Sequence, residues 1–279
     1  MPKAYWVTVY RSISDPQKVA AYAKLAPSDE FSIQAGKLPT LIGAEYAFTF
    51  QNMNIERGLL WAQEPIISRG VQANYTLGPV AFSLSLNDGF YSDSYNWLTG
   101  SAAYTIDKAN TLTVAAGGNF GHTSKNVVST TLPPTFKSPF FYNNSDIFNI
   151  IYTYSAAPWT ITPYFQYNHV PSGLGFISDN ATVGGAILAS YAVNDNVSVA
   201  GRAEYIGSTG NANSPNLLFG PSSSAWSLTF TPTYQEGIYF MRQELSYVHA
   251  NSITNGFAFG KAGNQRGQGR VMIEGGVIF

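Results

Sequence analysis

Hydrophobic and polar residues alternate along many short segments of this chain. In residues 225–234, AWSLTFTPTY, every even position carries a large apolar residue or proline, and the odd positions carry Ser, Thr or Ala. The chain closes on a similar segment, 270–279, RVMIEGGVIF. In a β-strand these two sets lie on opposite faces, one suited to lipid and the other to water. The pattern predicts an antiparallel transmembrane β-barrel and hence an all-β fold.

Turn lengths support the same interpretation. Tight connections near residues 78, 109, 157, 195 and 236 alternate with long polar loops, as in barrels whose strands run up and down across a membrane. We expect about twelve strands and expect Trp226, Leu228, Phe230, Val271, Ile273 and Val277 to face lipid. The expected strands are 31–37, 69–77, 80–87, 97–106, 111–121, 147–155, 160–169, 182–193, 197–206, 225–234, 238–249 and 268–279.

Composition narrows the class of protein. Charged residues make up 11% of the chain, against roughly 25% in soluble domains. No apolar run reaches the about 20 residues of a membrane-spanning helix. A net charge of -1 without a basic cluster argues against nucleic acid as a partner. The alternative that stays open is a large soluble β-sandwich with an aromatic core.

The first 30 residues do not fit the barrel pattern, and we expect them to be a short, foreign-looking partial domain. They predict a short strand and then a helix that begins at Asp15 and Pro16 and ends near Ala26. The short segments Lys3-Ala-Tyr-Trp-Val and Asp15-Pro, together with Tyr22, resemble the N-terminus of a small protein family. The members of that family have a ferredoxin-like dimeric α+β barrel. Residues 1–10 show no apolar core and no cleavage site, so we expect that the chain as given lacks a signal peptide.

Four segments in the first third of the barrel region are more specific. They read GKLPTLIGAE at 36–45, NMNIERGLLW at 52–61, SRGVQ at 68–72 and LNDGF at 86–90. Over about residues 31–279 the chain resembles the OmpL-like β-barrel porins of Gram-negative outer membranes, the porin-2 family. The resemblance implies a location in outer-membrane lipid, passive diffusion of small hydrophilic solutes or ions, no cofactor and no enzymatic reaction. If strand 31–37 lacks a partner, residues 5–10 are a candidate edge strand.

Charged residues suggest where solutes pass. Three late strands repeat Arg and Glu on the polar parity, either as ion pairs that stiffen the wall or as solute-selecting groups. These expected pore-lining residues are Arg202, Glu204, Arg242, Glu244, Arg270 and Glu274. The connection 38–68 carries further charges, and its apolar residues favour folding into the barrel over lying across the rim. Its expected constriction residues are Glu45, Glu56, Arg57, Trp61 and Glu64, followed by Arg69. Its acidic excess predicts a mild cation preference that depends on Glu56 and Glu64.

Two other functions stay open. The first is a non-conducting surface barrel with adhesive or display loops, although small residues on the lumen parity of strands 80–87 and 111–121 favour an open pore. The second, weaker one is an outer-membrane phospholipase that uses His122 and Ser124, which have the spacing of a His–Ser dyad. The three histidines do not lie on consecutive strands, so we expect no metal site.

Overall fold

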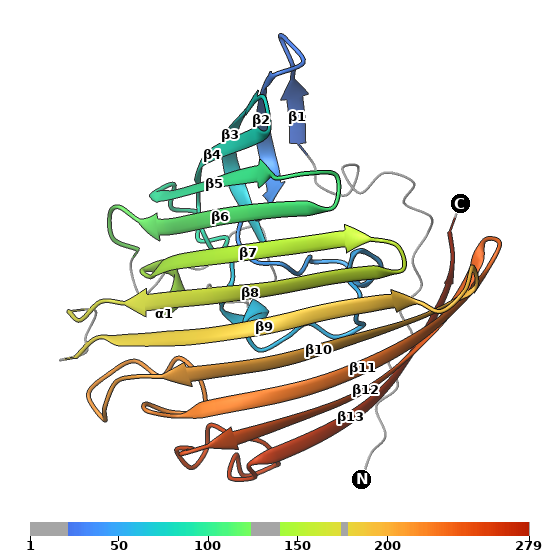
Figure 1. Ribbon diagram of the computed structural model, residues 1–279. Helices are drawn as coiled ribbons and strands as arrows, with labels where there is room; N and C mark the ends of the chain where they lie inside the picture. The colour runs from blue at the N-terminus through green and yellow to red at the C-terminus, as the bar shows by residue number, and fades with distance from the viewer. Residues whose placement is uncertain (1–21, 124–139, 174–177, 279) are drawn as a thin grey trace.

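The computed structural model describes residues 22–123, 140–173 and 178–278 of the chain. Within these residues, thirteen strands form one antiparallel sheet in which spatial order follows chain order (Figure 1). The strands are β1 (Tyr22–Leu25), β2 (Phe31–Pro39), β3 (Ile67–Leu77), β4 (Val80–Asn87), β5 (Trp97–Thr105), β6 (Asn110–Asn119), β7 (Asp146–Ala156), β8 (Trp159–Val170), β9 (Asn180–Ala192), β10 (Val197–Ser208), β11 (Ser224–Glu236), β12 (Tyr239–Asn251) and β13 (Gly267–Val277). A short helix, α1 (Phe140–Asn143), precedes β7. None of the described helices is long and apolar enough to span a membrane.

Glycine at the tight turns fixes the register of the hairpins. Leu77 pairs with Val80 across a two-residue turn in which Gly78 has φ +55°. Glu236 pairs with Tyr239 across a second such turn, where Gly237 has φ +56°. Two-residue hairpins need positive φ, which glycine adopts without steric cost. All twelve strands expected from the sequence are present.

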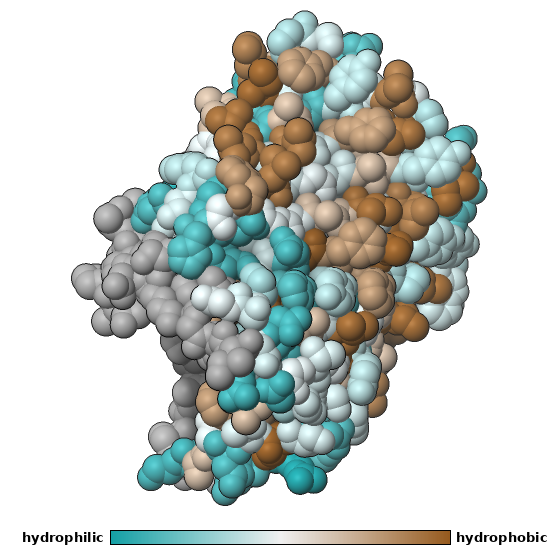
Figure 2. Space-filling view, turned by 90° about the vertical axis from the view of Figure 1, so that its left-hand side faces the viewer, coloured by the Kyte–Doolittle hydropathy of each residue, from teal (hydrophilic) through white to brown (hydrophobic). Residues whose placement is uncertain are grey.

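The two faces of the sheet differ as the alternation predicts. On the outer face, the side chains of Leu228, Phe230, Val271 and Ile273 are 50–74% exposed. Figure 2 shows hydrophobic side chains gathered over a broad area of one side of the molecule. On the opposite parity of β11, Thr229 and Thr231 are buried. Apolar residues therefore point away from the interior, which excludes a sandwich with a shared apolar core between two sheets.

The N-terminal strands require a correction. Residues 22–25, expected as the end of a helix, form strand β1, which pairs with β2 from Tyr22↔Gly36 to Leu25↔Ile33. The edge of β2 offers backbone hydrogen-bond partners to residues 22–25. The expectation of a helix rested on local sequence alone and did not include this pairing. The rest of the expected helix and the candidate edge strand 5–10 lie outside the described residues. The sheet is strongly curved (Figure 1). In the described part of the chain no pairing joins β1 to β13, so the sheet is open between these two strands.

The long segment between β2 and β3, residues 40–66, is called here the inner connection. It contains two short 3-10 turns, η2 (Thr49–Gln51) and η3 (Trp61–Gln63), and lies against the polar face of the sheet (Figure 1). The Gln166 side-chain amide of β8 donates to the Leu60 carbonyl at 3.0 Å, and the Thr182 hydroxyl of β9 lies 2.5 Å from Gln63 Oε1. Leu60 is fully buried among residues such as Ile206. The connection therefore folds inward, as its apolar content predicts.

Candidate functional site

Arg202, on the inner face of β10, is the centre of the first cluster that holds the inner connection. Its guanidinium lies 2.6 Å from Glu45 Oε1 and 3.1 Å from Glu204 Oε2, and all three side chains are buried. It also donates to the Glu56 carbonyl at 2.7 Å. Gly58 permits this close approach, because a Cβ there would lie 1.9 Å from Glu204 Oε1. The cluster thus ties two parts of the connection to one strand.

A second cluster on β12 and β13 binds the backbone of the same connection. The Glu244 carboxylate accepts a hydrogen bond from the backbone N–H of Ile55 at 2.6 Å. The Arg242 guanidinium donates to the Asn52 carbonyl at 2.8 Å and, through Nε, to Glu274 at 2.8 Å. Charge-assisted hydrogen bonds to backbone groups are among the stronger ones in proteins. Charged wall residues therefore fix the path of the connection at several points.

Two acidic residues of the connection are far from bulk water. Burial raises the pKa of Glu45 to about 7, although the neighbouring Arg202 opposes this shift. Burial, with added repulsion from Glu45 and Glu204, raises the pKa of Glu64 well above its ordinary value. Neither carboxyl oxygen of Glu64 has a hydrogen-bond partner in the described part of the chain. A neutral Glu64 therefore suits this position better than a charged one.

The charged residues expected to line an open pore lie mostly beneath the inner connection. Arg202, Glu204, Arg242 and Glu244 are at most 6% exposed, and the side chain of Glu274 is 8% exposed. The sequence pattern placed them correctly on the inner parity, but it did not show that the connection covers them. Arg270 differs, because its side chain is about half exposed and lies 3.8 Å from Glu56 Oε2.

The expected constriction residues divide in the same way. Glu45 and Glu64 are buried, whereas Glu56, Arg57 and Trp61 are partly exposed. Burial keeps Glu64 away from open space, whereas Glu45 borders a hollow between the connection and the wall.

Arg69 is not part of this group. It pairs with Asp88 at 2.7 Å and with Asp93, and it lies 4.0 Å from the ring centroid of Tyr91. Arg69 therefore braces the loop after β4.

Several contact residues were missed by reasoning from charge alone. Gln166 and Asn168 on β8 bind backbone carbonyls of the connection, and Asn54 donates to the Thr231 hydroxyl at 2.8 Å. The polar parity of β8 is the signal that could have found the first two. Of the proposed phospholipase pair, His122 is exposed and Ser124 lies outside the described residues.

Three hollows of about 370, 500 and 230 Å³ lie between the connection and the wall. The first lies beside hydroxyl groups of β6–β8, among them Thr113 and Thr162, and the second is bordered by Arg202, Glu204 and Arg270. The third lies next to Arg242. Water and small polar solutes fit such surroundings, so the inner face combines a seated connection with residual polar space.

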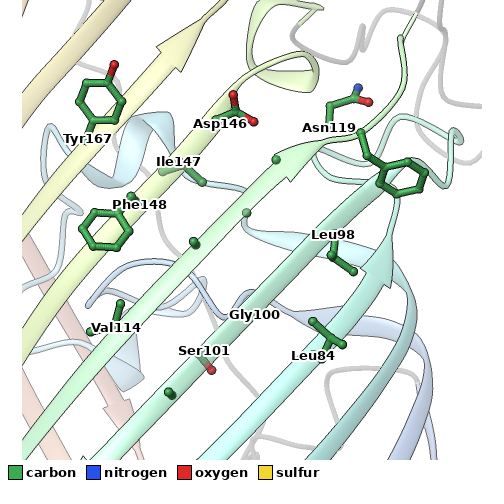
Figure 3. Close-up of a pocket in the computed structure, with 15 residues that line it drawn as sticks. Leu84, Leu98, Gly100, Ser101, Val114, Asn119, Asp146, Ile147, Phe148 and Tyr167 are labelled. Carbon is green, nitrogen blue, oxygen red and sulfur yellow. The ribbon is translucent and has the colours of Figure 1, made fainter.

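A separate hollow of about 800 Å³ lies on the outer face, over β4–β8. Figure 3 shows it between Leu84, Leu98, Val114 and Phe148, with Gly100 at its floor. These side chains have the lipid-facing parity. This hollow is therefore part of the apolar exterior and not of a path for hydrophilic solutes.

Comparisons with known proteins agree with this geometry. The profile of the family described as "Putative beta-barrel porin-2, OmpL-like" matches residues 17–279. No curated protein sequence matches the chain. Part of the segment expected to be foreign lies within the family match, and nothing supports its resemblance to a ferredoxin-like family.

Solved outer-membrane proteins share the fold at low sequence identity. In vitro folded OmpT of Vibrio cholerae is 14% identical with a TM-score of 0.58, over 91% of this chain and 87% of that one. An anion-selective porin from Comamonas acidovorans is 12% identical with a TM-score of 0.57, over 92% and 72%. The outer membrane channel DcaP of Acinetobacter baumannii is 11% identical with a TM-score of 0.51, over 78% and 65%.

These solved proteins have the same fold as this chain, and the family match covers nearly the whole chain. The alternating faces, the antiparallel order and the polar inner wall are those of an outer-membrane β-barrel channel. The chain belongs to the OmpL-like β-barrel porin-2 family, and its role is that of a porin.

Proposed function

We propose that small hydrophilic solutes diffuse passively past the inner connection, through the polar space between it and the wall. The observation that carries this proposal is that buried charges on β10, β12 and β13 hold the connection against the wall, with polar hollows left beside it. A segment folded into a barrel narrows the lumen without closing it when polar space remains. Diffusion of this kind needs no bound cofactor and no covalent step, so we further propose that the protein is not an enzyme.

In this proposal the charged residues have two roles. Arg202, Glu204, Arg242 and Glu244 hold the connection, while the partly exposed pair Glu56 and Arg270 meets the solute. With the partly exposed Arg57 beside them, these groups carry charges of both signs that partly cancel, so the channel discriminates little between cations and anions. The acidic influence that the sequence assigned to Glu56 and Glu64 then falls on Glu56, because Glu64 is buried.

We also propose that the site of action is the outer membrane and that the barrel domain begins at or before β1. Pairing of β1 with β2 supports a domain boundary earlier than residue 31. The alternative function is a barrel whose loops act in adhesion or display without conducting. It shares the fold and differs only in whether ions pass.

Reversal potentials in a planar bilayer with a KCl gradient test the proposal. The refolded chain should produce stepwise currents, and its reversal potential should lie near zero. Glu56→Gln should move that potential toward anion preference, whereas Glu64→Gln, the matched buried control, should leave it unchanged. Absence of any current steps would favour the display barrel, and a shift with Glu64→Gln alone would contradict the assigned roles.

A further inference from the structure

One of the inner hollows, of about 500 Å³, combines aromatic and charged borders. It lies between the inner connection and the wall formed by β10–β13. Trp61 of the connection borders it, together with Phe219 and Phe259 from the loops that precede β11 and β13. The ring centroids of Phe219 and Phe259 are 5.0 Å apart, and the Arg57 guanidinium lies over the Trp61 ring at 5.4 Å. Three aromatic side chains thus stand beside a polar path.

Most charges around this hollow already have partners. Arg202 and Glu204 are buried and bound to each other, and Glu204 also accepts from the Ser227 hydroxyl at 2.5 Å. The Arg57 side chain donates to backbone carbonyls of the connection, including that of Ile55 at 3.3 Å. Arg202 and Glu204 therefore offset each other's charge, whereas the carbonyl partners of Arg57 fix its position and leave its positive charge in place.

Glu56 and Arg270 form a loose pair of opposite charges beside the hollow, and Arg270 also donates through Nε and Nη2 to the Gln268 side chain at 3.0 and 2.7 Å. Arg270 Nη1 and Glu56 Oε2 lie 3.8 Å apart, beyond hydrogen-bond distance, and their side chains are 47% and 36% exposed. The hollow also reaches Ser246, a hydroxyl residue on the inner face of β12. A ligand here meets a donor, an acceptor and a hydroxyl close to apolar rings.

We infer that this hollow is a binding site for a small neutral carbohydrate during its passage, an inference that rests on the proposed function. A pyranose ring has C–H faces that pack on aromatic rings, and its hydroxyl groups both donate to a carboxylate and accept from a guanidinium. A cation or an anion would be attracted by one member of the Glu56–Arg270 pair and repelled by the other. The volume lies within the about 300–1,000 Å³ typical of small-molecule sites.

Blocking of the ion current by sugar tests the inference. Single channels of the refolded full chain in KCl are titrated with maltose, and separately with gluconate and glucosamine as charged comparators. Maltose should interrupt the current in a saturable way. Trp61→Ala and Phe259→Ala should each raise the half-blocking concentration about tenfold, the effect of losing one aromatic contact. Phe257→Ala, an exposed aromatic of the same loop that does not border the hollow, is the matched control.

The outcomes separate this inference from the proposed function. Channels that conduct but respond to maltose only in proportion to its concentration would overturn the binding site and leave the porin intact. Stronger block by gluconate or glucosamine would replace the neutral site with a charged one and overturn the inference. A chain that migrates as a folded barrel and gives no current steps would overturn both. Equal effects of Phe257→Ala and Phe259→Ala would also remove the assignment to this hollow.

Discussion

At the scale of single residues, the inner wall is stabilised by arginines that each bind several oxygen atoms. Arg202 binds Glu45, Glu204 and the Glu56 carbonyl. The guanidinium and its partners are therefore removed from water together. Buried charges persist when their hydrogen-bonding groups are satisfied, and removal of one partner leaves the other unpaired. The structure therefore predicts unequal consequences for arginines that look equivalent in the sequence.

Arg202→Met should destabilise the folded barrel strongly, because Glu45 and Glu204 would remain buried without their cation. Losses from breaking a buried pair are about 3–5 kcal/mol. Arg270→Met removes an exposed pair with a separation of 3.8 Å and should cost about 0–1 kcal/mol. Urea unfolding in lipid vesicles, followed by heat-modifiable mobility, compares the two variants. Equal unfolding midpoints would contradict the assigned difference.

Stability should fall as pH rises from about 4.5, through a contribution from Glu64. Burial raises the pKa of this connection residue in the folded state, so the folded chain keeps a proton that the unfolded chain releases. The same direction holds for Glu45, whose raised pKa of about 7 marks where its contribution ends. Glu64→Gln should therefore match the wild type near pH 4 and exceed its stability at pH 8. Urea midpoints at both pH values measure this, and a variant less stable at pH 8 would refute it.

At the scale of elements, the strands could be predicted from the sequence and the inner connection only in part. Period-two alternation and glycine turns set strand positions locally, as at Gly78 and Gly237, so boundaries fell within a few residues. The side that the connection takes could be predicted from its apolar residues. Its path could not, because contacts such as Ile55 to Glu244 join groups 189 residues apart.

The candidate site could likewise be predicted from the sequence only in part. Parity placed Arg202 and Arg242 on the inner face, since one face of each strand is polar. Their burial depends on the connection above them, and no local pattern encodes it. The end of the helix expected up to Ala26 is wrong for a related reason, because pairing with β2 decides the conformation of residues 22–25.

Gly43→Ala should loosen the inner connection while the strands stay folded. Gly43 has φ +86°, and a Cβ there would lie 1.8 Å from the Glu64 carboxylate. Gly78→Ala is the matched control, since it also has positive φ, +55°, but nothing within 4 Å. Limited trypsin digestion at Arg57 should be faster in Gly43→Ala than in the wild type and unchanged in Gly78→Ala. Equal cleavage of both variants would show that the close contact between residue 43 and Glu64 does not hold the connection in place.

At the scale of the whole molecule, the outer face defines the solvent in which the fold is stable. Leu228 lies near the middle of β11 and is 56% exposed. Many apolar residues on the neighbouring strands are exposed as well. Such a continuous apolar surface is unfavourable in water and favourable in lipid. The position of each substitution along the membrane normal should then control its cost.

Leu228→Arg should reduce stability in lipid vesicles by about 2–4 kcal/mol, the cost of arginine at the bilayer midplane. Tyr239→Arg, at the turn end of β12, should cost about 0–1 kcal/mol because the interface tolerates charge. Urea unfolding in vesicles of both variants provides the comparison. A larger loss for Tyr239→Arg would contradict the orientation of the barrel in the membrane.

We infer that conduction runs through a lumen narrowed by the inner connection. The most direct test of this inference is the unitary conductance of the refolded wild type compared with a variant in which residues 46–62 are replaced by a short Gly-Ser linker. Both proteins should give current steps, and the variant should give larger ones because the wall hollows merge into one wider path. Steps of equal size would place the connection outside the path, and a wild type that folds but never conducts would contradict the porin function.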